Sequence, residues 1–566
     1  MILAVLVGSA LSVVGTDEVS ETEPFTVKDG AFAVTLDEAI VPYTGTDVTV
    51  EATNAQGKEL FVGTANGVDV DSYLDGVAQE QISNVKFPSD VQHRFIPGEP
   101  APAAAIADQD WWLSQDTGTA VSKTFNLDVE PQVLVVAPAN ADENLEGTTV
   151  TMKMRVEGVF GWSLIGIALA IILLGAALFF GLRWWNGRIR PQRKDSDSSR
   201  SSGGASSGAK PDDASPAAKP AGAERSPGRS GTVTPASPRR RDGQRKRMLR
   251  VGTAMTLGSG LALSGCGVLP IAQPDNPDIT PYERTAIRPG EAGKYMTEYT
   301  ESLDKILKEG GNGLESIQGA PLIDRTRAQI QIAEKAKQKL TAPNFTEVVA
   351  GGPSFQEYPM WFYAFGTTNG DDKMTQVQLV TRESAVAKTI VRAASYIPAE
   401  QAPTLLANGR GAVDTAPKDF TDAMAPSAEK VSAYLVDGKA DKSLGGLEEG
   451  GFKSFRDYLG QLRGEDSGFD EVNAKCQPYS ELDFSSMTLK TENGAIGMGE
   501  IRCTLTIKVP DDYSLDLGDT IEAVKTNDKD GNTVEVDTAH PYVLVKSDDS
   551  LKAMAIDWDV TSSRVV

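Results

Sequence analysis

The sequence predicts a multidomain chain with an N-terminal antiparallel β sandwich, one transmembrane helix, a disordered linker and a C-terminal α+β region. Three observations lead to this prediction. The length of 566 residues is enough for several domains. Residues 159–182 form a run of 24 residues without a charged side chain. Acidic residues dominate before this run and again towards the C-terminus, whereas basic residues dominate in between.

Composition argues against several classes of function. The chain has 55 basic and 78 acidic side chains, a formal net charge of −23, whereas a nucleic-acid binder normally carries clustered Lys and Arg that contact phosphates. Its two histidines, His93 and His540, lie far apart in sequence, and no CxxC pair is present. We therefore expect no nucleic-acid partner, no metal site, no cofactor and no histidine-based catalysis, and we assign no catalytic residue.

The N-terminal part of the chain predicts an exported domain. Residues 1–15 form an apolar run, which indicates a signal or anchor segment. Residues 23–157 alternate short runs of β-type residues with turn signals, such as the Asn-Ala-Gln-Gly stretch at 54–57. This spacing predicts a small antiparallel β sandwich. The segment from 17 to 157 carries 25 acidic and 7 basic residues, which agrees with a position outside the cytoplasm.

Residues 159–182 predict the transmembrane helix. At about 1.5 Å per residue the run spans ~36 Å, which exceeds the ~30 Å hydrocarbon core of a bilayer. Trp162, Trp184 and Trp185 lie near its ends, where amphipathic rings favour the membrane interface. Five positive charges follow within 183–194, so we expect the β domain outside and the next segment in the cytoplasm.

The segment 183–250 predicts a basic cytoplasmic linker. It contains 17 basic and 6 acidic residues. Its central part, 195–238, consists mostly of Ser, Ala, Gly and Pro and has no aromatic residue. Such a segment has no apolar face that could offset the entropy of ordering, so we expect disorder.

The segment 251–266 has the pattern of a lipoprotein signal. A basic cluster precedes an apolar run of about 13 residues, which ends in Leu263, Ser264, Gly265 and Cys266. This order resembles the lipobox of bacterial lipoprotein precursors. The resemblance implies that the Cys266 thiol is linked to diacylglycerol and that the chain is cleaved before this residue, with membrane lipid as a partner.

The internal position of this signal leaves two interpretations open. Met248 lies just before it, as the start of a separate gene would, which indicates a fusion of two neighbouring reading frames. Alternatively, residues 251–272 form a second, Gly-rich spanning helix. Both interpretations place the C-terminal region on the extracytoplasmic face.

After a Gly- and Pro-containing tether at 267–290, the sequence predicts two α+β units, 291–415 and 416–566. In each unit, segments with helical spacing precede runs of β-type residues that form hairpins. Helices followed by an antiparallel meander suggest tandem cystatin-like or NTF2-like units, in which a helix packs on a curved sheet.

Two further resemblances concern whole regions. The stretches FVGTA at 61–65, VDVDSYLDGV at 68–77 and DQDWW at 108–112 resemble an uncharacterised actinobacterial single-span membrane protein family over about 25–182. The helix at 321–340, the WFYAF strand and the Cys-containing strand resemble an uncharacterised actinobacterial lipoprotein domain, which with its lipobox covers about 263–566. These resemblances imply an exported, anchored protein and supply no catalytic motif.

Few residues stand out as candidate sites. Trp111 and Trp112 are candidates for a ligand contact, because exposed aromatic rings stack on sugars and peptides. With Cys266 lipidated, Cys476 and Cys503 remain, and their spacing predicts a disulfide, which persists only outside the cytoplasm.

Three carboxylates are candidates for acid chemistry. Asp483, Asp557 and Asp559 could serve as acids in a pocket of the C-terminal region, as in enzymes with an NTF2-like fold. Nothing in the sequence pairs them, so solvated carboxylates are the simpler interpretation.

We therefore expect a membrane- and lipid-anchored protein of the cell envelope with both folded domains outside. Its expected role is a non-enzymatic module that binds envelope components or other membrane proteins. One alternative is a carboxylate-dependent hydrolase or isomerase in the C-terminal region, and another is a transmembrane scaffold.

Overall fold

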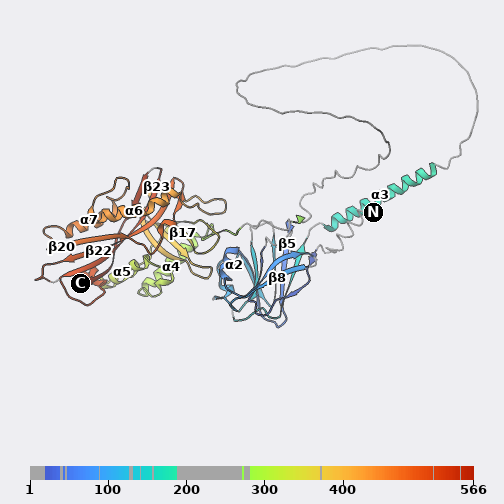
Figure 1. Cartoon of the computed structure of the whole chain (residues 1–566), viewed down its shortest axis with the longest axis horizontal. Helices are drawn as coiled ribbons and strands as arrows, with labels where there is room; N and C mark the ends of the chain where they lie inside the picture. The colour runs from blue at the N-terminus through green and yellow to red at the C-terminus, as the bar shows by residue number, and fades with distance from the viewer. Residues whose placement is uncertain are drawn as a thin grey trace, which may run out of the picture. The chain divides into compact units, whose positions relative to one another are not determined.

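The structure is a computed structural model of the whole chain (Figure 1). The predicted signal segment 1–15, most of the linker 183–250 and the lipobox with Cys266 lie outside the residues that it describes. The chain forms two compact units, and the larger one comprises Leu6–Ser163 and Gly267–Val566. The described residues are 19–37, 43–44, 47–87, 90–102, 104–126, 132–140, 142–155, 159–187, 271–272, 281–369, 373–513, 515–548 and 550–566.

Residues 19–155, here called the β domain, form two packed sheets. One sheet has the strand order β1-β12-β5-β10, with β2 also on β12, and the other has the order β8-β7-β3-β11-β6-β9. Strand β4 (Tyr43–Thr44) pairs instead with β13 (Ile271–Ala272). The sandwich strands are β1 (Val19–Glu21), β2 (Phe25–Thr26), β3 (Ala33–Asp37), β5 (Asp47–Asn54), β6 (Leu60–Ala65), β7 (Gln79–Lys86), β8 (Asp90–Ile96), β9 (Ser114–Gly118), β10 (Ala120–Asn126), β11 (Val133–Pro138) and β12 (Thr148–Arg155).

The hydrophobic pattern explains how these strands pack. In β5, every second residue faces the partner sheet, so Val48, Val50 and Ala52 are buried. Strands β6 and β11 are buried along their whole length, because one face lies on the sandwich core and the other lies under a second apolar cluster. Helix α2 (Gly67–Tyr73) and the 3-10 turn η2 (Ile106–Asp108) contribute to this second cluster.

The prediction of a wholly antiparallel sandwich is wrong at one strand pair. Strands β3 and β7 run parallel, with Val34 opposite Glu80. The chain between them passes through β5, β6 and α2, and this long connection lets β7 enter the sheet in the same direction as β3.

Helix α3 covers Val159–Gly187. Its side chains are described without a break only from Ile171 to Trp184, and these are exposed. Within the described part of the chain, no helix is both long and apolar enough to cross a membrane. The predicted transmembrane helix at 159–182 is therefore wrong, and the fold class is corrected to a β-rich multidomain chain.

Residues 281–566, here called the C-terminal region, begin with two helices and a four-stranded antiparallel sheet of order β15-β17-β18-β19. Residues of β17 alternate between two cores: Phe362 and Ala364 pack with α4, whereas Tyr363 and Phe365 join a core in the second half of the region. The elements are β14 (Arg284–Thr285), α4 (Ala292–Lys308), η3 (Leu314–Ser316), α5 (Leu322–Lys335), β15 (Phe345–Gly351), β16 (Ser354–Phe355), β17 (Met360–Thr368), β18 (Met374–Arg382), β19 (Ile390–Pro398) and η4 (Ala399–Gln401).

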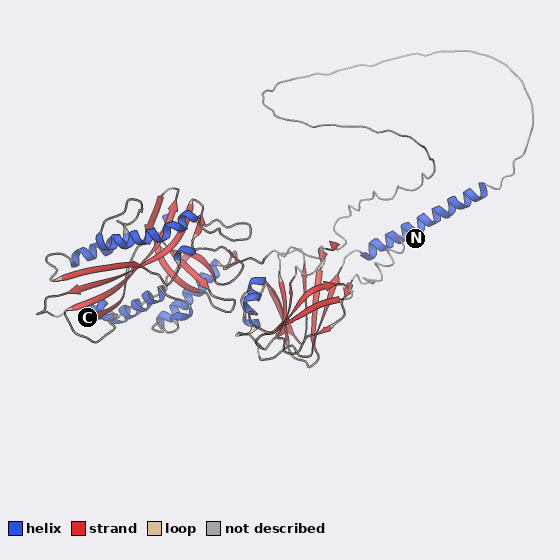
Figure 2. Cartoon of the chain, viewed as in Figure 1, coloured by secondary structure: helices blue, strands red, loops and turns tan. Residues whose placement is uncertain are grey.

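The second half repeats the order of helices followed by an antiparallel sheet, here β20-β22-β23-β24 with β21 on β22 and β25 on β23. Helices α6 and α7 lie along one side of its long strands (Figure 2). On the opposite side, Arg502 of β22 donates to the carbonyl oxygen of Pro321, at the start of α5. The elements are α6 (Lys418–Asp437), α7 (Gly450–Leu462), β20 (Glu471–Pro478), η5 (Phe484–Ser486), β21 (Leu489–Thr491), β22 (Gly494–Lys508), α8 (Gly518–Ala523), β23 (Thr533–Ser547), β24 (Ser550–Met554) and β25 (Asp559–Val565).

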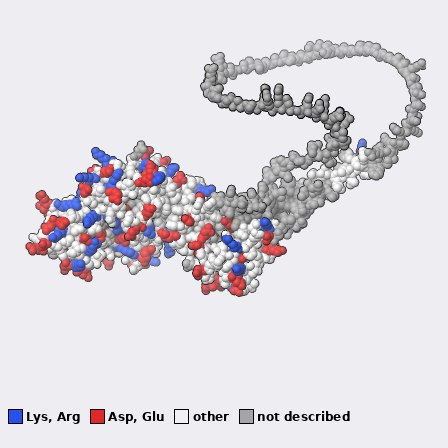
Figure 3. Space-filling view, viewed as in Figure 1, with Lys and Arg blue, Asp and Glu red and all other residues white. Residues whose placement is uncertain are grey.

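The two helix–sheet units are therefore not independent. The hydroxyl of Tyr363 in the first sheet donates to the carbonyl oxygen of Met487 in the second unit at 2.8 Å. Both residues belong to one continuous apolar core. Acidic and basic side chains are interspersed on the face of the region that Figure 3 shows.

Candidate functional site

A cleft in the C-terminal region is the candidate functional site. It encloses a cavity of about 240 Å³ between helices α4 and α5, strand β19 and the start of β25. Its walls combine leucine side chains, two tyrosines and several polar groups. The residues that line it are Tyr299, Leu303, Leu307, Gln318, Leu322, Arg325, Thr326, Gln329, Leu340, Thr341, Pro343, Gln376, Ala394, Ser395, Tyr396, Pro541, Asp557 and Asp559.

An ion pair between α5 and β25 forms one wall of the cleft. Arg325 donates from Nε to Oδ2 of Asp559 at 2.8 Å and from Nη1 to the carbonyl oxygen of Ala394 at 2.8 Å. The amide of Gln329 donates to the other carboxylate oxygen, Oδ1, at 2.8 Å. The side chains of Arg325 and Asp559 are only 11% and 15% exposed. Asp559 is thus held as a fixed carboxylate whose two oxygens both have donors.

Asp557 lies two residues before Asp559, and its side chain is exposed at the cleft. Partial burial raises the pKa of Asp557, the negative charge of Asp559 raises it further, and Arg325 opposes the rise. Among the described residues, its carboxylate has no hydrogen-bond or ion-pair partner. Asp557 is therefore available to accept a hydrogen bond from a molecule in the cleft.

Gln318 contributes a second acceptor. Its side chain is 3% exposed, and its Nε2 donates to the hydroxyl of Tyr299 at 2.9 Å. Its Oε1 is buried and has no hydrogen-bond partner among the described residues. A buried acceptor without a donor costs free energy, on the order of 1–3 kcal/mol.

The buried carboxylate of Glu500 interacts electrostatically with Arg325, which lines the cleft. The side chain of Glu500 is fully buried, and its Oε1 lies 2.5 Å from Nε of Arg502. Burial raises the pKa of Glu500, while Arg325 and Arg502 act in the opposite direction. The cleft therefore lies against a charge cluster that joins α5 to β22 and β25.

Sequence reasoning identified Asp557 and Asp559 but not Arg325, Gln318 or Glu500. Arg325 and Asp559 are 234 residues apart, so no local spacing connects them. The available signal was weak: Glu500 and Arg502 interrupt a run of β-type residues in β22, and burial of such charges requires a partner.

The third carboxylate, Asp483, lies elsewhere. It caps the 3-10 turn η5, where it accepts hydrogen bonds from the backbone amide and the hydroxyl of Ser485. These bonds lower the pKa of Asp483. It has a local structural role and does not line the cleft.

The interpretation of Trp111 and Trp112 as a ligand contact is wrong, because both side chains are buried, with 1% and 8% exposure. Their rings lie 4.2 Å apart, and Trp112 also packs on Phe61 of β6. The indole of Trp112 donates to the carbonyl oxygen of Ile106 at 2.8 Å. The pair covers the outer face of β6 and β11 and offers no flat surface to a ligand.

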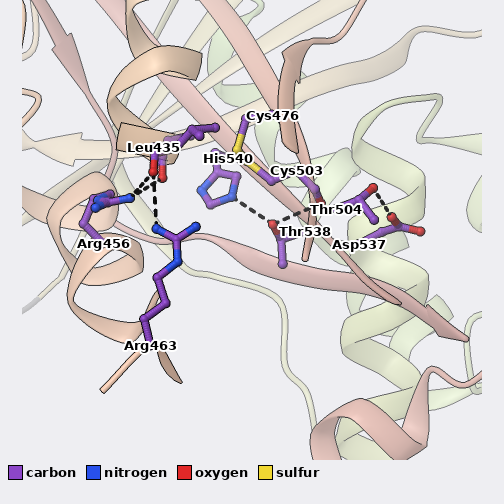
Figure 4. The surroundings of a disulfide bond; sticks show 10 residues. Leu435, Arg456, Arg463, Cys476, Cys503, Thr504, Asp537, Thr538 and His540 are labelled. Atoms are coloured by element: carbon purple, nitrogen blue, oxygen red, sulfur yellow. Dashed lines mark hydrogen bonds between the residues drawn. A yellow bond between two sulfur atoms is a disulfide. The ribbon is translucent and has the colours of Figure 1, made fainter. Parts of the chain in front are cut away.

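Cys476 and Cys503 form a disulfide with an S–S distance of 2.03 Å (Figure 4). They face each other across strands β20 and β22. His540 is buried nearby and shares a hydrogen bond of 2.9 Å with Thr538. Burial lowers the pKa of His540 to about 3, with Arg325 and Arg502 contributing. This histidine is a neutral core residue that is 1% exposed.

Neither metal-binding groups nor similarity to known proteins assigns a function to this chain. The described residues contain no group of three or more His, Cys, Asp or Glu side chains that could hold a metal ion. No family model, no curated protein and no solved structure matches the chain. The candidate function therefore depends on the geometry of the cleft.

Proposed function

We propose that the protein is a lipid-anchored, extracytoplasmic binding module of the cell envelope, without enzymatic activity, and that its C-terminal cleft binds a small molecule rich in hydroxyl groups. One observation carries the proposal. The cleft offers an exposed acceptor without a donor among the described residues, the carboxylate of Asp557, beside a fixed Arg325–Asp559 pair and beside Gln318, whose buried Oε1 has no partner.

The disulfide supports the extracytoplasmic location. Disulfides persist in oxidising compartments and are rare in the cytoplasm. The Cys476–Cys503 bond lies within the core of the C-terminal region, and Cys503 is buried. The predicted lipid on Cys266 would hold this region at the membrane surface.

The wall chemistry supports a hydroxyl-rich ligand. Tyr396 and the leucine side chains offer apolar contact to a sugar-like ring, while Asp557 accepts from hydroxyl groups. A purely apolar ligand would leave this carboxylate without a donor, and an anion would face Asp557 and Asp559.

Titration calorimetry of the full chain tests the proposal, with glucose and N-acetylglucosamine as neutral probes and putrescine as a cationic probe. We expect saturable heat with a sugar probe and weaker binding in an Asp557→Ala variant. Asp528→Ala, in an exposed loop away from the cleft, should bind like the wild type. Heat from putrescine alone, or an equal response of both variants, would refute a hydroxyl-specific site.

A carboxylate-dependent enzyme is the second candidate, because the raised pKa of Asp557 suits a general acid. The same full chain is incubated with chromogenic glycosides. Product release that disappears in Asp557→Asn would favour the enzyme, whereas sugar binding without any product release favours the binding module.

A further inference from the structure

The β domain and the C-terminal region meet at a buried ion pair. Asp69 of helix α2 is fully buried and pairs with Nη1 of Arg284, whose side chain is 9% exposed. The hydroxyl of Tyr358 donates to Oδ1 of Asp69 at 2.7 Å and accepts from Nη1 of Arg284 at 2.6 Å. Burial raises the pKa of Asp69, and Arg284 and Tyr358 oppose that rise.

Tyr282 lies beside this pair, in close contact with the start of α2. Its hydroxyl donates to Oδ1 of Asp37 at 2.6 Å. A Cβ atom added to Gly67 would lie 2.2 Å from the ring of Tyr282, so only glycine fits at this position. The side chain of Asn66, which caps α2, donates to the carbonyl oxygen of Glu283 at 2.9 Å.

Further contacts surround this centre. Arg288 donates to the carbonyl oxygen of Trp111 at 2.6 Å, and Arg382 donates to Oδ1 of Asp110 at 2.9 Å. The interface also has an apolar component, because Val68 of the β domain belongs to the core cluster of α4. Conversely, Ala385 of the C-terminal region belongs to the cluster that contains Trp111 and Trp112.

These features indicate a specific interface. A charge in an apolar surrounding is costly unless it is paired and hydrogen-bonded, so the surfaces around Asp69 and Arg284 are suited to stay together. The contacting residues are more than 200 positions apart for the Asp69–Arg284 pair, so proximity along the chain does not impose the contact.

The hydroxyl of Ser72 accepts a hydrogen bond from the backbone amide of Ala385 at 3.1 Å. We propose that the α2 face, comprising Asn66, Gly67, Val68, Asp69 and Ser72, is a docking surface for a separate polypeptide that has the sequence of the C-terminal region. The segment from Tyr282 to Arg288 is the recognised element. If the chain is cleaved before Cys266, as the lipobox predicts, this interface holds the two products together. The proposal shares the predicted lipobox cleavage with the proposed function but does not depend on ligand binding in the cleft.

The test uses the full chain with a protease recognition sequence inserted between Pro238 and Arg239. After cleavage, the two fragments are analysed by size-exclusion chromatography at micromolar concentration without denaturant. We expect them to elute together. Separation of the wild-type fragments would overturn the proposal.

Variants on both sides locate the interface. Asp69→Asn and Arg284→Gln each leave one buried charge without its partner, and each should weaken association about 100-fold or more. Gly67→Ala should also weaken it, because the new methyl group displaces Tyr282. Asp75→Asn, an exposed residue just after α2, is the matched control and should leave association unchanged.

Each charge substitution lies in only one fragment, so its effect on folding can be measured separately from its effect on association. Arg284→Gln alters no residue of the β domain, and Asp69→Asn alters none of the C-terminal region. Circular dichroism of each separated fragment should match that of its wild-type counterpart. Association as tight as in the wild type for both charge variants would show that the ion pair does not define the interface.

Discussion

Contacts with residues distant in sequence set the surroundings of some buried polar side chains in this protein. His540 is the clearest case: its ring packs edge-on against Phe455 at 4.4 Å and stacks near Trp558. Because the surrounding core is apolar and Arg325 and Arg502 add positive charge, protonation of His540 is unfavourable and its pKa falls to about 3. Between about pH 3 and pH 6.5, the folded protein therefore keeps this imidazole neutral, whereas the unfolded chain protonates it.

This difference predicts a dependence of stability on pH. Between pH 6.5, the ordinary pKa, and about 3, the unfolded chain binds a proton at position 540 that the folded protein does not bind. The free energy of unfolding should therefore fall as the pH falls, by about 1.4 kcal/mol per pH unit from this residue. Urea unfolding of the wild type and of His540→Gln, across this range, measures the effect.

The Gln variant should lose less stability than the wild type on acidification, because it has no imidazole to titrate. Thr538→Val removes the hydrogen-bond partner but keeps the imidazole, so it should retain the wild-type pH dependence. Parallel pH profiles for the wild type and His540→Gln would contradict this account of His540.

Individual strands show how the same residue types give different burial. Strand β5 alternates buried and partly exposed positions, as expected for a sheet with one covered face. Strand β11 is buried at every position because the Trp111–Trp112 cluster covers its second face. Strands β20 and β22 are joined by a disulfide in addition to the backbone hydrogen bonds between them.

That bond predicts a measurable loss of stability on reduction. The disulfide closes a loop with a sequence separation of 27, and the chain-entropy model assigns such a loop about 3 to 4 kcal/mol. Guanidinium unfolding with and without reductant should show that reduction lowers the free energy of unfolding by this amount.

A Cys476→Ala/Cys503→Ala double variant is the control for this measurement. It should unfold at the same denaturant concentration with or without reductant, close to the reduced wild type. If the wild type were insensitive to reductant while the reduced thiols reacted with an alkylating agent, the bond would have no stabilising role.

On the scale of the entire chain, charge and cysteine use bear on where the protein is located. The described folded parts are acidic and contain a disulfide, whereas the basic segment 183–250 lies largely outside the described residues. The proposed lipid anchor is inferred from sequence alone, since Cys266 is not among the described residues.

Mass spectrometry of the membrane fraction tests this anchor. We expect a fragment that begins at Cys266 and carries a diacylglyceryl group, and we expect Cys266→Ala to abolish both the modification and the cleavage. An intact chain with an unmodified Cys266 thiol would contradict the lipobox interpretation. Co-purification of the fragment 1–265 with the lipidated fragment would additionally support the docking surface around α2.

The predictable part of the fold follows from local patterns. Alternating apolar residues indicate the strands of the β domain, and helical spacing indicates α4 and α5, because these signals depend only on near neighbours. The apolar run at 159–182 is also helical, as part of α3, but the membrane crossing inferred from it was wrong.

Burial and pairing depend on the tertiary structure. The sequence of Trp111 and Trp112 is the same whether the rings are exposed or buried, and only packing under the second face of β6 and β11 makes them core residues. Likewise, the Arg325–Asp559 pair and the parallel β3–β7 pair join segments whose separation no periodic pattern spans. Neighbouring residues set local conformation, whereas long-range contacts decide which surfaces are covered and which charges meet.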